Sequence, residues 1–108
     1  MPAPVSGPLA GLRALEFAAI GPVPFCGMLL SDLGADIVRI DRPGAVYDKF
    51  MVETRGRRSV ELDLKTEAGV ATALALIERA DVVLEGLRPG VMERLGLGPD
   101  VALQRNSK

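Results

Sequence analysis

The hydrophobic pattern changes twice in the first part of the sequence, and this change constrains the fold more than any other feature. Arg13–Ala18 is a predicted buried strand, and Asp36–Ile40 is a second one because it is rich in β-branched residues. Between them, apolar residues recur at helical spacing from Val23, and Gly34 stands where a helix is expected to end. A strand, a helix and a strand with short connections form a βαβ unit, which implies parallel strands and a right-handed crossover.

The same alternation continues toward the C-terminus. Ser59–Leu64 and Asp81–Glu85 are predicted strands, and Thr66 can cap the helix between them. The stripe of this helix that is expected to face inward consists of Val70, Ala71, Ala73, Leu74 and Ile77. Short helices are expected over Val91–Leu95 and from Pro99 to Gln104. We therefore predict an α/β fold, a Rossmann-like parallel sheet with flanking helices.

The length of 108 residues allows one domain at most, and a hydrophobic fraction of 48% is enough for a real core. The last predicted helix is cut off by the end of the chain, and so short a helix is marginal in water. We therefore expect a truncated sheet, with residues 1–108 forming the N-terminal, incomplete part of a larger domain.

Composition argues against several classes of partner. A formal net charge of -1 is unlike a general nucleic-acid binder, and no segment has the length of a membrane-spanning helix. The single cysteine suits a reducing compartment and the N-terminus lacks the features of a signal peptide, so a cytoplasmic protein is expected. This cysteine, Cys26, lies in an apolar run and is expected to be buried. Histidine is absent, so an acid–base pair made from this chain would need other side chains with shifted pKa values.

Basic residues follow the predicted strands at the places where the strands end. Ligand crevices open outside the carboxyl ends of parallel strands. Four cations are expected at this rim: Arg42, Lys65, Arg88 and Arg94. Gly86 and Gly90 allow close backbone approach there. Each signal alone is weak, and Arg42 alone is better explained as a solvated surface residue, but together these residues favour an anionic ligand with several phosphates.

Two further segments argue against an NAD-type site and against RNA binding. The turn after the first strand lacks the spacing G-x-G-x-x-G and carries two prolines, so an NAD-type site is not expected. Asp41–Gly56 has no clear period and is predicted to be a long loop. At its end stands the basic cluster Arg55-Gly56-Arg57-Arg58, with no aromatic residues interleaved. A solvated loop, or a lid over a phosphorylated ligand, is favoured over RNA binding.

Several motifs in a fixed order resemble the N-terminal part of the family III CoA-transferases, the CaiB/BaiF type. They are Pro8–Arg13, Gly21–Phe25, Asp32–Gly44, Arg57–Ser59, Leu62–Lys65 and Arg88–Pro99. Within this family the chain is most similar to the α-methylacyl-CoA racemases. The formyl-CoA and oxalate branch has a glutamine shortly after the first strand, where this chain has Ala19. That difference favours the racemase branch.

The resemblance implies a Rossmann-like domain that binds coenzyme A (CoA), within a homodimer of interlocked subunits. Arg42 would contact the adenosine part of CoA. The adenine and its neighbouring phosphate would be cradled by Leu62, Asp63, Leu64 and Lys65. The rest of the nucleotide pocket would be lined by Gly86, Leu87, Arg88 and Arg94. An acyl-CoA thioester would be the substrate, and neither a prosthetic group nor a metal is implied.

The racemase reaction exchanges a proton at the carbon next to a thioester carbonyl. By resemblance, its histidine and aspartate lie downstream of this chain, so no catalytic residue is assigned. The implied function is that of a racemase fragment that epimerises 2-methylacyl-CoA only within the intact enzyme. Two alternatives stay open, a fragment of a transferase that moves CoA between carboxylic acids and a truncated, non-enzymatic binding domain. Loss of downstream segments is expected to expose apolar surface and make the isolated chain self-associate.

Overall fold

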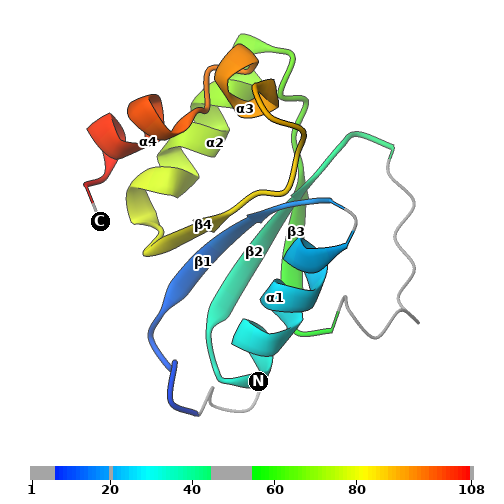
Figure 1. Ribbon diagram of the computed structural model, residues 1–108, viewed down its shortest axis with the longest axis vertical. Helices are drawn as coiled ribbons and strands as arrows, with labels where there is room; N and C mark the ends of the chain where they lie inside the picture. Colours follow the sequence, from blue (N-terminus) through cyan, green and yellow to red (C-terminus); the bar gives the residue numbers. More distant parts are fainter. Residues whose placement is uncertain (1–6, 20, 45–54, 108) are drawn as a thin grey trace.

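The computed structural model describes residues 7–19, 21–44 and 55–107. Four strands and four helices lie in these ranges (Figure 1). The strands are β1 (Arg13–Phe17), β2 (Asp36–Asp41), β3 (Arg57–Glu61) and β4 (Val82–Leu84). The helices are α1 (Pro22–Asp32), α2 (Glu67–Arg79), α3 (Val91–Arg94) and α4 (Pro99–Arg105). The predicted alternation of strands and helices is confirmed.

The strands form one parallel sheet in the order β3-β2-β1-β4. This order is that of a Rossmann-like sheet, in which the strand order reverses between β1 and β4. Helix α1 covers one face of the sheet, while α2, α3 and α4 lie on the other (Figure 1). The predicted α/β fold, a Rossmann-like parallel sheet with flanking helices, is therefore confirmed.

Local sequence signals account for the ends of the main helices. The Thr66 hydroxyl accepts a hydrogen bond from the Gly69 N–H at 3.1 Å, as expected for the N-cap of α2. Helix α1 begins at Pro22. Proline is tolerated there because a backbone N–H at the first helical position has no carbonyl acceptor within the helix. The helix ends before Gly34, whose φ of 104° is in the region that favours glycine.

Two details of the sequence prediction were wrong. The third strand is Arg57–Glu61 rather than Ser59–Leu64, because Arg57 pairs with Ile37 on β2 although it is not apolar. Ala71 is exposed, because it lies outside the inward stripe that Ala73, Leu74 and Ile77 form. A period of 3.6 residues turns adjacent positions about 100° apart on a helix, so neighbours of a buried residue often face solvent.

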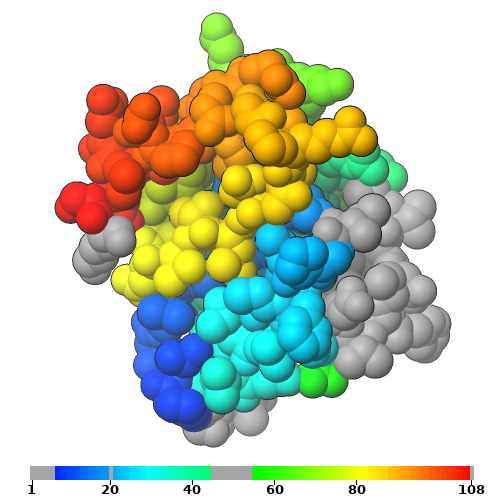
Figure 2. Space-filling model, viewed as in Figure 1, coloured from blue at the N-terminus to red at the C-terminus, as the bar shows by residue number. Residues whose placement is uncertain are grey.

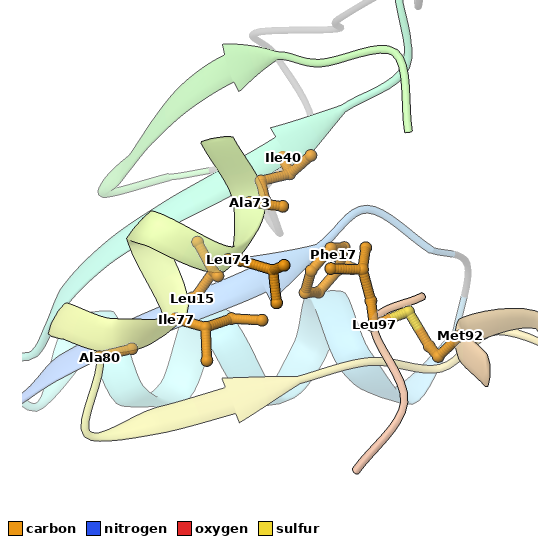
Figure 3. Packing of buried hydrophobic residues seen from close by; sticks show 9 residues of the cluster. All are labelled: Leu15, Phe17, Ile40, Ala73, Leu74, Ile77, Ala80, Met92 and Leu97. Carbon is orange, nitrogen blue, oxygen red and sulfur yellow. The ribbon is translucent and has the colours of Figure 1, made fainter. Parts of the chain in front are cut away.

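The hydrophobic core lies between the sheet and α2. In Figure 3, Leu74 and Ile77 point from α2 toward Leu15 and Phe17 on β1. The core also contains Ile40, Ala73, Ala80, Met92 and Leu97. Met92 and Leu97 bring α3 and the segment after it onto this layer. The core therefore places α3 beside the carboxyl ends of the strands.

Two side chains connect the end of α4 to α2: Arg105 forms an exposed ion pair with Glu78 at 2.6 Å, and Asn106, which follows α4, binds backbone carbonyls. The Asn106 amide donates to the carbonyl oxygens of Ile77 at 3.0 Å and Ala80 at 2.7 Å. A weaker contact of 3.3 Å reaches the Glu78 carbonyl. These carbonyls lie at the C-terminus of α2, where backbone acceptors lack helical partners.

The outer side of α1 is apolar and lies at the surface in the view of Figure 2. Phe25, Leu29 and Leu33 are 52%, 45% and 44% exposed and recur every four residues. Self-association of the chain remains a prediction. Within the described ranges, no helix has the length and apolar character needed to cross a membrane.

Candidate functional site

A cavity of about 520 Å³ lies at the carboxyl edge of the sheet. Its wall is formed by Phe17, Ala18, Ile40, Asp41, Arg42, Pro43, Leu62, Asp63, Leu64, Lys65, Leu87, Val91 and Leu95. The ends of β1 and β2, the segment after β3, and α3 therefore surround one hollow. This is the position at which ligands bind in open α/β sheets.

The carboxylates of the cavity wall already have partners within the protein. Asp41 accepts a hydrogen bond from the Arg39 guanidinium at 3.2 Å. One oxygen of the Asp63 carboxylate accepts from the Lys65 backbone N–H at 3.0 Å. In this way Asp63 helps to form the turn that leads into α2.

The cations of the same wall are not neutralised in this way. In the part of the chain that the structure describes, no ion pair joins Arg42 or Lys65 to a carboxylate. Both residues are exposed to solvent and line the cavity. Two cations without carboxylate partners favour an anionic group such as a phosphate.

The opposite part of the wall is apolar. Its apolar lining residues include Phe17 at the end of β1, Leu62 and Leu64 after β3, and Val91 and Leu95 in and directly after α3. Phe17 belongs to the core, and Leu62, Leu64 and Leu95 pack against it. An apolar surface next to two cations can receive a flat ring that carries phosphate groups.

The structure gathers six of the predicted site residues in this wall. They are Arg42, Leu62, Asp63, Leu64, Lys65 and Leu87. They come from three separate connections of the chain, so only the sheet brings them together. Their predicted contacts with a ligand stay a prediction, since the structure gives their positions and holds no ligand.

The remaining three predicted residues, Gly86, Arg88 and Arg94, do not line the cavity. A Cβ on Gly86 would lie 2.7 Å from Cγ2 of Val23, so Gly86 allows close packing against the start of α1. Arg88 and Arg94 are exposed and flank the turn that begins α3. They lie next to the cavity residues Leu87 and Leu95 in the chain.

Sequence reasoning missed several residues of the wall, notably Phe17, Val91 and Leu95. Phe17 was expected only to supply apolar bulk to a strand, and its position as the last residue of β1 was the available signal. Val91 and Leu95 are four residues apart, which predicts one helix face. Nothing in that spacing indicates that this face borders a cavity.

The basic cluster before and within β3 is not a free loop. Arg57 is buried in an ion pair with Glu16, Nε to Oε1 2.9 Å, with both side chains 0% exposed. Arg55 and Arg58 form exposed ion pairs with Asp32 and Asp36. The interpretation as a solvated loop is therefore wrong for Arg57 and Arg58, which lie in β3, whereas Arg55 and Gly56 do form an exposed turn. The preceding segment 45–54 lies outside the described residues.

The thiol of Cys26 is half-buried on α1, so the prediction of full burial was wrong. The helix presents Pro24, Gly27 and Met28 to the interior instead. Cys26 lies between Phe25, which is exposed, and buried Gly27. It therefore stands at the border between the two sides of α1.

A second cavity of about 500 Å³ lies beside the edge strand β4, between α2 and α4. Its wall is mostly apolar and includes Val83, Met92 and Leu103. The ionisable residues in this wall are Asp81 and Glu85, and it contains no arginine or lysine. Its chemistry is therefore unsuited to a phosphate, in contrast to the cavity at the carboxyl edge.

Residues 9–108 match the family model described as CoA-transferase family III. The chain is 49% identical to the α-methylacyl-CoA racemase of Mus musculus over 100 residues, which are 93% of this chain and 26% of that protein. It is 37% identical to the succinyl-CoA:mesaconate CoA-transferase of Haloarcula hispanica, over 93% of this chain and 30% of that protein. The chain thus spans less than a third of the length of these relatives.

Solved structures show the same fold. The crystal structure of the Mycobacterium tuberculosis protein Rv3272 superimposes with a TM-score of 0.87 and 41% sequence identity. The match covers 94% of this chain and 31% of that one. A CAIB/BAIF family protein from Brucella suis gives a TM-score of 0.83 at 29% identity, over 93% of this chain and 31% of its own.

Proposed function

The chain belongs to CoA-transferase family III, and on that premise we propose that it forms the nucleotide-binding part of an α-methylacyl-CoA racemase. The substrate of the intact enzyme is a CoA thioester of a 2-methyl acid. Its CoA part is bound in the cavity at the carboxyl edge of the sheet. The racemase activity is supported by 49% identity to the mouse racemase and 46% identity to the human one.

One observation carries the binding proposal. Arg42 and Lys65 line a cavity whose carboxylates have partners in the protein and whose other wall is apolar. In the proposed complex, Arg42 contacts the adenosine part of CoA. The adenine and its neighbouring phosphate are held by Leu62, Asp63, Leu64 and Lys65. Leu87 borders the same ring.

Gly86, Arg88 and Arg94 have a more peripheral role in this proposal. The two arginines are exposed beside α3 and contact parts of the ligand that project out of the cavity. Gly86 keeps the backbone close to α1, which leaves space for the ligand at the strand ends. No prosthetic group or metal takes part.

The reaction is α-proton removal from the acyl group and its return on either face. A base takes the proton, the enolate is stabilised by dipoles and hydrogen-bond donors, and an acid returns a proton. We assign neither acid nor base to this chain. Binding of the remote CoA handle positions the acyl carbon for groups supplied by the rest of a homodimeric, cytoplasmic enzyme.

A second candidate is transfer of CoA between carboxylic acids. It is supported by relatives named as CoA-transferases, such as that of Haloarcula hispanica at 37% identity. The two candidates share the same nucleotide site and differ in the acyl chemistry. Dependence of product formation on an added acceptor acid would support the transferase, whereas deuterium exchange at the α-carbon without an acceptor would support the racemase.

The binding proposal is tested by titrating this chain with CoA and with 3′-dephospho-CoA in a calorimeter. We expect CoA to bind more tightly, because a charge-assisted hydrogen bond contributes about 1.5–3 kcal/mol, or roughly a tenfold to hundredfold change in affinity. Lys65→Ala should remove most of that difference. Arg79→Ala removes an exposed cation from the far end of α2 and is the matched control.

Equal affinity for the two ligands, unaffected by Lys65→Ala, would show that this cavity does not recognise the phosphate. The same protein is also incubated with 2-methylacyl-CoA in heavy water. No deuterium should enter the α-carbon above the buffer blank, because this chain supplies a binding site for CoA but neither the acid nor the base. Incorporation above the blank would mean that groups on this chain perform the chemistry.

A further inference from the structure

Four charged side chains gather on the face of the sheet that α1 covers. They are Glu16 on β1, Arg39 and Asp41 on β2, and Arg57 on β3, and we call them the charge cluster. Arg39 is the register partner of Glu16, so the two side chains stand side by side on one face. Arg39 pairs with Asp41, with side chains 9% and 14% exposed, and Arg57 pairs with Glu16. The cluster therefore connects three adjacent strands.

The cluster also holds the beginning of α1. The Arg57 guanidinium donates from Nη2 to the Pro24 carbonyl oxygen at 2.8 Å, in addition to its bond with Glu16. Gly27, on the next turn, approaches so closely that a Cβ there would clash with Oε1 of Glu16. One guanidinium thus ties a strand end to the first turn of a helix.

One member of the cluster lies in the cavity wall, and another is close to it in the chain. Asp41 belongs to that wall, and its carbonyl oxygen accepts a hydrogen bond from the Leu62 N–H at 3.0 Å. Glu16 lies two residues before Ala18, whose N–H donates to the Ile40 carbonyl at 2.9 Å. Wall residues of β1 and β2 therefore lie within two positions of a cluster member, and the segment after β3 is tied to the cluster through the Asp41 carbonyl.

Stability alone is a poor explanation for this arrangement. Replacing a buried ion pair by apolar residues of similar size is often neutral or stabilising, because desolvation offsets the attraction between the charges. Here one oxygen of Glu16, Oε2, is buried without a hydrogen-bond partner among the described residues. A core chosen only for stability would contain apolar side chains at these positions. The cluster supplies directional bonds instead, which fix geometry.

We infer that the charge cluster is a positioning device for the cavity at the carboxyl edge, with Arg57 as its central positioning residue. Arg57 acts through Glu16 and Pro24 on the strand ends, and it does not itself line the cavity. The expected effect of the cluster on CoA affinity rests on the proposed function. Its expected effect on the stability of the strand ends does not, and that effect can be measured without a ligand.

The test compares Arg57→Lys with Arg58→Lys in this chain. Both positions are in β3 and both arginines pair with a carboxylate, but Arg58 is exposed and its ion pair is with Asp36 on β2. Lysine at 57 can meet Glu16 with its single ammonium but not also the Pro24 carbonyl in the same geometry. Backbone hydrogen exchange is followed by NMR at the two ends of the strands.

The reporter amides at the cavity end are those of Ala18 and Leu62, and the reference amide at the opposite end is that of Asp81, which is not adjacent to the Arg58 ion pair. In Arg57→Lys, exchange at the cavity end should accelerate roughly tenfold more than at the reference end, equivalent to about 1.4 kcal/mol of local opening. In Arg58→Lys the two ends should change equally. If Arg57→Lys does not fold, Glu16→Gln, which keeps the shape of the side chain, is used in its place.

Equal acceleration at both ends in Arg57→Lys would overturn the inference, because the cluster would then add only to global stability. CoA titration gives the second readout. We expect folded Arg57→Lys to bind CoA more weakly than the wild type by about tenfold, with Arg58→Lys unchanged. Unchanged affinity in Arg57→Lys would show that the cluster does not position the ligand site. A wild-type chain that binds no CoA would refute the proposed function, and the exchange comparison would still decide the positioning role.

Discussion

The two faces of the sheet are packed by different kinds of side chain. On the α2 face, Leu15, Phe17 and Ile40 meet Leu74 and Ile77 in an apolar layer. On the α1 face, the small buried cluster of Ala14, Ala35 and Ile37 is followed along the strands by the charge cluster. The change from apolar to charged packing occurs toward the carboxyl ends of the strands, where the cavity lies.

The difference indicates what each face contributes. Apolar packing is non-directional and tolerates exchanges that conserve volume, so it holds the layers together with some freedom of detail. Buried charges require defined partners at defined distances, and a lost partner leaves a desolvated charge. The α2 face therefore supplies most of the cohesion, while the α1 face fixes where the strand ends lie.

The largest effect is expected when the charge cluster loses one member. Glu16→Leu leaves the Arg57 guanidinium buried without its carboxylate and should lower the free energy of unfolding by about 3–5 kcal/mol. The double variant with Arg57→Leu should recover most of this loss, because no uncompensated charge remains. Urea denaturation of the two variants measures both values.

The double variant sharpens the comparison between the faces. It should be stable while its cavity end remains loosened, since apolar side chains supply no directional bonds to Pro24. A double variant as unstable as Glu16→Leu would show that the pair contributes more than mutual charge compensation. The α1 face would then depend on this pair for cohesion as well as for geometry.

A smaller change in the free energy of unfolding is expected when Gly27 of α1 or Ala73 of α2, the small residues that pack against the sheet, is substituted. Gly27→Ala should lower the free energy of unfolding by about 1–3 kcal/mol through overpacking against Glu16, although alanine normally favours a helix. On the other face Ala73 is 0% exposed, and Ala73→Gly should cost about 1 kcal/mol through helix propensity. Thermal unfolding of both variants measures the contrast. Stabilisation by Gly27→Ala would mean that α1 can move away from the charge cluster.

The smallest effect concerns pH. Burial raises the pKa of Glu16 above 4.5, although the hydrogen bond and charge of Arg57 oppose the shift. The folded chain therefore holds this proton at pH values where the unfolded chain has lost it. The contribution is fully present below the unfolded pKa and is lost as the pH rises through the folded pKa.

This pH dependence is measured as the difference in free energy of unfolding between the wild type and Glu16→Gln. We expect that difference, wild type minus variant, to decrease as the pH rises from 4.5 toward neutrality. Asp32→Asn is the control of opposite sign. The hydrogen bond from Arg55 lowers the pKa of Asp32, so its contribution is lost as the pH falls. A wild-type advantage over Glu16→Gln that increases with pH would contradict the direction given for Glu16.

The parts of the molecule that the sequence could predict are those set by local pattern. The strand around Leu15, the helix capped by Thr66 and the end of α1 at Gly34 follow from hydrophobic period, capping chemistry and a glycine conformation. The rule for parallel strands then indicated that Arg42 and Lys65 share one edge. The assignment of these positions to a CoA site came from resemblance to a family.

The parts that could not be predicted depend on contacts between distant residues. Arg57 was assigned to a loop because its strand contains one apolar residue, Val60, and shows no hydrophobic alternation. Its partner Glu16 is 41 positions earlier, so nothing near Arg57 marks it as buried. In the same way, Val91 and Leu95 border the cavity only because α3 is placed there by the core.

The buried pair also restricts the paths by which this sequence can evolve. A change at Glu16 or Arg57 alone passes through an intermediate weakened by about 3–5 kcal/mol, which is a large share of the roughly 5–15 kcal/mol that stabilises a typical domain. Substitution at Gly27 is restricted by the same pair, because any larger side chain there would clash with Glu16. We therefore expect these three positions to change together, although they lie in three separate elements of the fold.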